Sequence, residues 1–376
     1  MKTNWTPTYT KGVGNSFLLW FENSNSYVVI DSFLNQLLHF FLLAKDKADF
    51  LASTKSIEGI LESQIETYYD EIYNFLERCN TIQKEESPTS KHKTIEVDIS
   101  HLYNINGVTF KINYGSSVIK SIIHPQLAYL STASNLKTPQ HTFGILLIDS
   151  HLCLFNNDEF INAYPKKDYH LLQGKLAMQL LCALYKNTEQ NWLSTFHAST
   201  VTNGKEAIML IGNSGKGKST FTALLTLNGF NLVADDLTPL RDDKKIYSYP
   251  AAISIKEGAF NTIETYNPNF KTEKEYFFGP KKGQVKFLKP NNKQNFNKGY
   301  ACTKIVCIDY NKNNKNSLSI CNPEDALNTL IPESWLSPDK NHAKQLLDWI
   351  SQITFYNLSY SDTDFALKEF SSLFNS

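Results

Sequence analysis

The sequence has no excess of charge of either sign, because its 376 residues include 37 Lys and Arg and 37 Asp and Glu. A neutral chain gives no electrostatic reason to expect a nucleic-acid partner, since such binding rests largely on clustered positive charge. The sequence also lacks a secretory signal, because the N-terminus MKTNWTPTYTKG has no apolar core. The most apolar early run, 33–44, is too short and too polar to cross a bilayer. We therefore expect a cytoplasmic protein with no membrane partner.

Cysteine is sparse, and no two cysteines form a C-x-x-C pair. This excludes the usual zinc-binding spacing, and six cysteines in so long a chain do not predict a disulfide framework. We expect most of them to be free and buried as small hydrophobic side chains. They are Cys79, Cys153, Cys182, Cys302, Cys307 and Cys321.

What is present is enough apolar material for a core, with 41% hydrophobic and 13% aromatic residues. The length favours two or three domains. Near the N-terminus, hydrophobic runs at 16–21 and 26–30 flank a polar break, which predicts a β-hairpin. Helical spacing follows at 33–41, with Ser32 as the expected N-cap, and further helices are expected around 57–61 and 65–76. The polar stretch that follows predicts a linker at 86–94, between a domain at 1–85 and one at 95–376.

The second domain reads as a mixture of strands and helices. Strands are expected at 95–99, 108–112, 118–122, 144–148, 152–155, 248–255 and 304–309. Helices are expected at 171–185, 343–353 and 364–374, and the polar run 311–316 is expected to be a loop.

The clearest motif is GNSGKGKS at 212–219, which matches G-x-x-x-x-G-K-[ST] without a mismatch. Glycines there let backbone N–H groups point at phosphate oxygens, and the following helix adds its positive end. An apolar run at 207–211 and a helical run at 219–227 supply the strand and helix that this motif requires. A glycine-rich turn without a ligand is the alternative. The residues predicted to bind nucleotide are Gly212, Asn213, Ser214, Gly215, Lys216, Gly217, Lys218, Ser219 and Thr220.

Two aspartates follow the next apolar run, at Asp235 and Asp236. Carboxylates at the end of a strand beside a phosphate loop can hold Mg²⁺ or accept a proton from an attacking hydroxyl. Adjacent residues of an extended strand point opposite ways, so both tasks are open to this pair only where the strand ends or turns. A solvated strand end is the alternative. His197, in FHASTV, is either structural or part of the site.

The order FHASTV, LIGNSGKGKST and NGFNLVADD resembles the HPr kinase/phosphorylase family. The resemblance implies an α/β chain, α+β overall, with a phosphoenolpyruvate-carboxykinase-like P-loop kinase core. It also implies ATP and Mg²⁺ as cofactors and transfer of the γ-phosphoryl group to a serine hydroxyl. Carried over to this sequence, Lys218 binds phosphates, Asp235 is the general base and His197 is the active-site histidine. The implied metal-side residues are Ser219, Asp236 and Glu257.

Two departures narrow this resemblance. His197 is followed by Ala198 and Ser199, where the family usually has glycine, and the family's later HPr-contacting signature is not found. Both features are similar to HPr-kinase-related proteins encoded with peptide-modification genes, some of which phosphorylate a ribosomally made precursor peptide. The N-terminal pattern resembles a small winged-helix, PqqD-like domain, which binds a leader peptide as an added strand. An ordinary α+β cap or a dimerisation module is the alternative reading of that region.

We therefore expect an ATP-dependent serine kinase that acts on a precursor peptide or small protein. A kinase of a small hydroxyl substrate such as free serine, and a nucleotide-gated peptide-binding module without transfer activity, remain open. The reverse phosphorylase reaction and a homo-oligomeric state are open as well. Lys281 and Lys282, in the turn 277–283, either neutralise charge on the transferring group or belong to a solvated loop.

Overall fold

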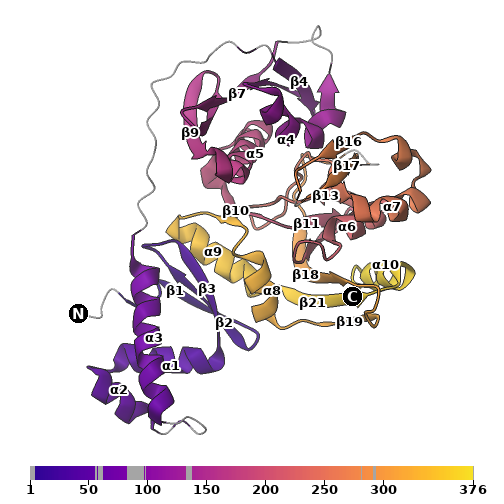
Figure 1. Cartoon of the computed structure of the whole chain (residues 1–376). Coiled ribbons are helices and arrows are strands. Elements are labelled where there is room, and N and C mark those ends of the chain that lie inside the picture. Colours follow the sequence, from indigo (N-terminus) through magenta and orange to yellow (C-terminus); the bar gives the residue numbers. More distant parts are fainter. Residues whose placement is uncertain are drawn as a thin grey trace.

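The computed structural model describes residues 5–55, 57, 62–82, 97, 99–132, 138–280, 282–290 and 294–375. Helices and strands occur together along the chain, which confirms the expectation of a mixed α/β protein (Figure 1). The helices are α1 Ser32–Leu43, α2 Lys47–Thr54, α3 Glu62–Asn80, α4 Ser117–Leu127, α5 Tyr169–Tyr185, α6 Lys218–Leu227, α7 Phe260–Tyr266, α8 Pro323–Leu330, α9 Lys340–Ile350 and α10 Thr363–Ser372. The expected linker at 86–94 lies outside the described residues.

The N-terminal part is an antiparallel sheet in the order β1-β2-β3 with three helices. Its strands are β1 Tyr9–Val13, β2 Ser16–Phe21 and β3 Ser26–Asp31. The predicted hairpin is confirmed as β2 and β3, and β1 was not predicted. Strand β2 is buried on both faces: Leu19 and Phe21 pack with α1 and α3, while Leu18 and Trp20 join a core that includes α8 and α9. The N-terminal sheet is therefore fastened to the C-terminal half of the chain.

Two details of the N-terminal helices differ from the prediction. Asp31, not Ser32, caps α1, because its carboxylate accepts a hydrogen bond from the Leu34 N–H at 2.7 Å while Ser32 is already helical. Helix α2, which begins after the Asp46 cap, was not predicted, and most of the helix expected around 57–61 lies outside the described residues. Helix α2 was not recognised because it is short and buries only Phe50 and Thr54, and residues 58–61 lie outside the description.

The next part of the chain forms a six-stranded sheet in the order β6-β4-β5-β7-β8-β9. Helices α4 and α5 pack on it, and their leucines and isoleucines form one core with the strands. The predicted strand at 118–122 is wrong, because this run lies in α4, capped by the Ser116 hydroxyl and with Ile119 and Ile123 buried at helical spacing. Most of the strand expected at 95–99 lies outside the described residues, and β4 includes its last residue, Ile99. The strands are β4 Ile99–Ile105, β5 Val108–Tyr114, β6 Ser131–Thr132, β7 His141–Ile148, β8 His151–Asn156 and β9 Glu159–Pro165.

A second six-stranded sheet carries the glycine-rich loop, in the order β13-β11-β12-β18-β21-β19. Strands β12, β18 and β21 are parallel. Both faces of β12 are buried: Met209 packs in the core with α8 and α9, and Leu210 packs in the core with α6 and α10. Such central parallel strands place ligands at their carboxyl ends. The strands are β11 Ser199–Thr202, β12 Glu206–Ile211, β13 Asn231–Ala234, β18 Ala301–Tyr310, β19 Ser317–Ile320 and β21 Thr354–Tyr360.

Two small antiparallel sheets, β14-β10-β20 and β15-β17-β16, complete the fold. The strand predicted at 248–255 is wrong in its first half, because only β15 pairs with a neighbour there. The predicted helices at 171–185, 343–353 and 364–374 correspond to α5, α9 and α10. The strands are β10 Trp192–Phe196, β14 Thr238–Arg241, β20 Trp335–Leu336, β15 Ile253–Lys256, β16 Glu275–Phe277 and β17 Gln284–Leu288.

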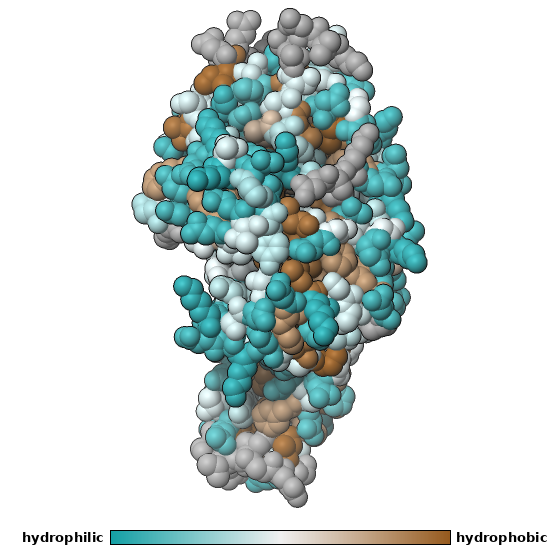
Figure 2. Space-filling view, turned by 90° about the vertical axis from the view of Figure 1, so that its right-hand side faces the viewer, coloured by the Kyte–Doolittle hydropathy of each residue, from teal (hydrophilic) through white to brown (hydrophobic). Residues whose placement is uncertain are grey.

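The surface is mainly hydrophilic on the side shown in Figure 2, where hydrophobic residues form small groups. No helix among the described residues combines the length and apolar composition needed to cross a membrane. All six cysteines are free thiols, in line with the expectation of no disulfide framework, but only half of them are buried. Cys79, Cys153 and Cys302 are buried, and the other three are half-buried.

Candidate functional site

The glycine-rich loop turns from the end of β12 into α6, as the motif predicts. Gly215 and Gly217 have φ of +88° and +91°, a left-handed conformation that side chains rarely adopt. Gly212 lies so close to β18 that a Cβ there would be 2.8 Å from the Ile308 carbonyl oxygen. The neighbouring strand holds the loop from outside, because Lys216 Nζ contacts Asp309 Oδ1 at 2.7 Å. The loop is thus shaped by its glycines and by the end of β18.

Lys218, the first residue of α6, has a largely buried side chain directed at the site. Its Nζ donates a hydrogen bond to the His197 carbonyl oxygen at 3.4 Å and lies 3.5 Å from Asp236 Oδ1. A buried ammonium needs such partners, since an unpaired buried charge is costly. The predicted lysine, histidine and aspartate therefore meet in one place.

Asp235 is buried at the end of β13 and joins three elements. Its Oδ1 accepts hydrogen bonds from the Ser199 hydroxyl at 2.5 Å and the Ser219 hydroxyl at 3.2 Å. Its Oδ2 accepts one from the Ser254 N–H at 3.2 Å. Burial raises the pKa of Asp235, and the negative charge of Asp236 adds to this rise, while Lys218 opposes it. The carboxyl group of Asp235 is thus tied to the serine of the glycine-rich loop.

Asp236 points to a different set of partners. Its φ is +66°, so the chain leaves the strand conformation directly after β13. This agrees with the expectation that both tasks, metal binding and proton acceptance, are open to the pair only where the strand ends or turns. Asp236 Oδ1 lies 3.3 Å from His197 Nε2 and 3.5 Å from Lys218 Nζ. Desolvation works against its ionised form, but Lys218, then His197 and Lys282, hold the pKa of Asp236 below its usual value.

His197 lies in the short connection between β10 and β11. Besides Asp236, its Nε2 faces Glu333, whose Oε2 is 3.6 Å away. Its backbone N–H donates to the Ser334 hydroxyl at 3.4 Å. Glu333 and Ser334 follow α8, far along the sequence, and the motifs contain no signal for them. Ser199 was also not predicted, although it lies in the same FHASTV segment.

Glu257 is not brought into this group. It is exposed at the start of the 3₁₀ helix η4, Glu257–Ala259, and no contact joins it to Ser219 or Asp236 in the described part of the chain. The preceding Lys256 does reach the loop, because its Nζ donates to the Ser214 hydroxyl at 3.3 Å. Across the described ranges, no three His, Cys, Asp or Glu side chains are clustered closely enough to hold a metal by themselves. Lys281 lies outside the described residues.

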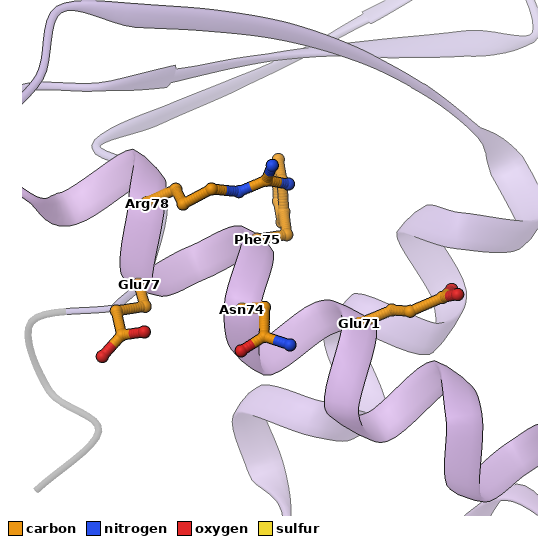
Figure 3. Close-up of a pocket in the computed structure, with 5 residues that line it drawn as sticks. All are labelled: Glu71, Asn74, Phe75, Glu77 and Arg78. Atoms are coloured by element: carbon orange, nitrogen blue, oxygen red, sulfur yellow. The ribbon is translucent and has the colours of Figure 1, made fainter.

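A separate hollow of about 590 Å³ lies in the N-terminal part, along α3. Figure 3 shows the Arg78 side chain reaching toward the ring of Phe75, while Asn74 and Glu77 extend elsewhere on the helix. The described residues that line it are Glu71, Asn74, Phe75, Glu77 and Arg78. The hollow is lined by charged and aromatic groups and by none of the residues of the glycine-rich loop.

Comparison with known proteins adds no assignment. A scan against protein-family models finds no match, and a search of curated protein sequences finds no match either. The predicted residues that the structure brings together in the candidate site are His197, Lys218, Ser219, Asp235 and Asp236.

Proposed function

We propose that this protein is a Mg²⁺- and nucleotide-dependent kinase that transfers a phosphoryl group to a serine hydroxyl of a peptide or small protein. One observation carries the proposal: a phosphate-type loop, a buried lysine and two aspartates with different partners converge in one site. Phosphoryl transfer needs positioning and charge neutralisation more than covalent chemistry, and this arrangement can supply both. The proposed architecture is a phosphoenolpyruvate-carboxykinase-like P-loop core with a winged-helix N-terminal domain.

The residues present fit a nucleotide polyphosphate. Gly215 and Gly217 have the left-handed backbone that lets successive N–H groups line a concave loop, and no side chain fills the space at Gly215. The loop runs into the N-terminus of α6, where the helix dipole favours an anion. Lys218 and Lys256 bring positive charge from two different elements. When bound, the nucleotide would supply the phosphoryl group.

Ser219 and Asp235 would hold Mg²⁺, because a hydroxyl and a carboxylate are the hard oxygen ligands that this ion prefers. The resemblance assigned the metal side to Asp236 and the base to Asp235. The contacts favour the opposite division, since the loop serine hydrogen-bonds to Asp235 and not to Asp236. In this proposal Ser199 and the Ser254 N–H hold Asp235 in place.

Asp236 then interacts with the hydroxyl group that accepts the phosphoryl group. Its side chain is about half exposed, so a substrate hydroxyl can approach it, and its oxygen faces His197 and Lys218. A carboxylate whose pKa is held low by the neighbouring charge of Lys218 is ionised at neutral pH and accepts the hydrogen bond of the hydroxyl. As the phosphoryl group moves, Asp236 receives the hydroxyl proton, and Lys282 adds positive charge from the turn before β17.

A peptide acceptor is favoured by the N-terminal part of the chain. In its sheet β1 and β3 are the edge strands, and an edge can accept an extended peptide through main-chain hydrogen bonds. The hollow along α3 offers Arg78, two glutamates and Phe75 to side chains of such a peptide (Figure 3). This part of the proposal corresponds to a PqqD-like role in holding a leader segment.

The test is transfer of γ-³²P from ATP to candidate precursor peptides and, in parallel, to free serine. Lys218→Ala should lower transfer at least 100-fold, about 2.7 kcal/mol, because it removes the buried charge at the phosphates. Lys205→Ala is the matched control, since Lys205 is an exposed lysine just before β12. Full transfer by Lys218→Ala would refute the assignment, and labelling of free serine alone would favour the small-substrate kinase.

A second pair of variants tests the division between the aspartates. Asp235→Asn should raise the Mg²⁺ concentration needed for half-maximal transfer, because it weakens a metal ligand. Asp236→Asn should lower kcat while that Mg²⁺ concentration stays near the wild-type value, because an amide cannot accept the proton. The reverse pattern would return the metal to Asp236 and the base to Asp235.

A further inference from the structure

The segment 331–336, which follows α8, makes two contacts with His197. The Ser334 hydroxyl accepts a hydrogen bond from the His197 N–H and donates one to the carbonyl oxygen of Leu330 at 2.6 Å. Ser334 therefore bridges the end of α8 and the backbone of the histidine. Glu333 adds the second contact, with Oε2 at 3.6 Å from His197 Nε2. One segment thus touches both the backbone and the imidazole of His197.

The same segment is held in register with the strand that leads to His197. Its last two residues form β20, which pairs antiparallel with β10. Thr195 lies opposite Trp335 and Ser194 lies opposite Leu336. Because β10 ends at Phe196, directly before the histidine, a shift of β20 along β10 would move Glu333 relative to His197.

The N-terminal hairpin fastens this segment from the other side. Asn25 lies in the β2–β3 turn with φ of +50°, and its Nδ2 donates a hydrogen bond to the Leu336 carbonyl oxygen at 3.0 Å. Its Oδ1 accepts a hydrogen bond from Trp20 Nε1 at 2.9 Å, which fixes the amide. At the far end of α8, Pro323 packs so closely on Gly14 that a Cβ there would be 2.9 Å from Pro323 Cγ. Figure 1 shows α8 and α9 between the N-terminal sheet and the central sheet.

We propose that Glu333 and Ser334 are positioning residues for His197, and that Asn25 of the N-terminal hairpin sets where they lie. The catalytic role of His197 in this inference rests on the proposed function, whereas the contacts that hold His197 do not depend on it. The N-terminal part is then a component of the catalytic unit as well as a place to hold a peptide. The side chain of Glu333 is largely exposed, so its effect is orientation of the ring more than Coulomb energy.

The arrangement favours one tautomer of His197. His197 Nε2 faces carboxylate oxygens of Asp236 and Glu333, and ionised carboxylates can only accept hydrogen bonds. These neighbours therefore favour a proton on Nε2 when the imidazole is neutral. This gives a signature that does not depend on any enzymatic assay.

The first experiment reads that signature in the full chain. Long-range ¹H–¹⁵N spectra of ¹⁵N-histidine-labelled protein at alkaline pH, with the His197 signal identified by His197→Gln, should show the Nε2–H tautomer. Glu333→Gln and Asn25→Asp should each shift or broaden the His197 signal, because the ring is held less firmly, while Asp236 still favours the proton on Nε2. Asn25→Asp keeps the acceptor for Trp20 and tolerates a left-handed φ, but loses the donor to Leu336. Asn23→Ala, at an exposed position, and Glu369→Gln, at a half-buried one, are the matched controls and should leave the signal unchanged.

The second experiment measures phosphoryl transfer. Ser334→Ala, Glu333→Gln and Asn25→Asp should each lower kcat about five- to tenfold with the KM for ATP unchanged. Ser334→Thr, which keeps the hydroxyl, should retain most of the activity. The double variant Asn25→Asp/Glu333→Gln should lose little more than the worse single variant, because both act through one segment.

The outcomes separate the two proposals. A His197 signal with wild-type shift and linewidth in both Glu333→Gln and Asn25→Asp overturns the positioning role, whatever the activity. If the wild-type chain transfers no phosphate but the His197 signal responds to both variants, the linkage stands and the kinase proposal fails. Additive losses of kcat in the double variant would show that Asn25 and Glu333 act separately, and would overturn the role of Asn25.

Discussion

Alanine substitutions at four glycines test whether the glycine-rich loop depends on left-handed backbone conformations and on close packing against β18. Gly215 has a left-handed φ but open space around a Cβ, so Gly215→Ala isolates the backbone cost of about 1–2 kcal/mol, partly offset by lower unfolded-state entropy. Gly212 has the opposite problem, because its Cβ would meet the Ile308 carbonyl oxygen at 2.8 Å. Ile308 lies in β18 between two paired strands and cannot move aside, so Gly212→Ala should cost roughly 1–3 kcal/mol.

Gly217 combines the two effects, with φ of +91° and a Cβ that would lie 3.1 Å from Tyr310 Cβ. We expect Gly217→Ala to cost roughly 2–3 kcal/mol, and Gly258→Ala, which has neither feature, to stay within about 0.5 kcal/mol. The assay is urea unfolding of each variant, together with titration by a fluorescent ATP analogue. Nucleotide affinity should fall at least tenfold, about 1.4 kcal/mol, for Gly217→Ala. If Gly217→Ala matches Gly258→Ala in both stability and affinity, the loop does not have this conformation.

Three further predictions concern ionisable side chains that are buried or half-buried. The pKa of Asp235 is raised in the folded state, so its contribution to the free energy of unfolding is present at acidic pH and is lost as the pH rises. Asp235→Asn should remove this loss when urea unfolding is measured from pH 4 to 8. A variant whose stability falls with pH as steeply as that of the wild type would contradict the prediction. The pKa of His124 is lowered to about 4 by burial and, to a smaller extent, by the charges of His101, Lys120 and Lys274. The free energy of unfolding should therefore fall by about 1–2 kcal/mol, after solvent screening, as the pH drops from 6.5 to 4. His124→Gln should flatten this acid loss in thermal melts, and an unchanged melt would count against it. Lys286 is buried, and its ammonium lies over the rings of Phe260 and Phe270. In guanidinium unfolding, Lys286→Ala should lower the free energy of unfolding by about 2 kcal/mol and Lys286→Met by clearly less, because methionine keeps most of the packing. Equal losses of stability would argue against packing as the cause.

The periodic and contiguous features of this chain were predictable because they depend on neighbours in the sequence. The strand, loop and helix around GNSGKGKS appear where the pattern places them, since the hydrophobic run of β12 and the helical run of α6 flank the glycines directly. Helices α5, α9 and α10 follow in the same way from their apolar spacing. The run at 118–122 was misassigned because Ile and Val suit a strand by propensity, while the Ser116 cap and the packing of α4 on its sheet favour a helix.

By itself, the sequence determined a mixed α/β chain, six free thiols, a glycine-rich loop between a buried strand and a helix, and two acids at a strand end. Tertiary structure alone decided which acid faces the loop serine, because that depends on a left-handed turn at Asp236 and on Ser199 arriving from β11. It also decided that Glu333 lies near His197 and that Asn25 contacts the end of the same segment at Leu336. Their positions are set by strand pairing and by packing between distant parts of the chain, and local sequence carries no record of either.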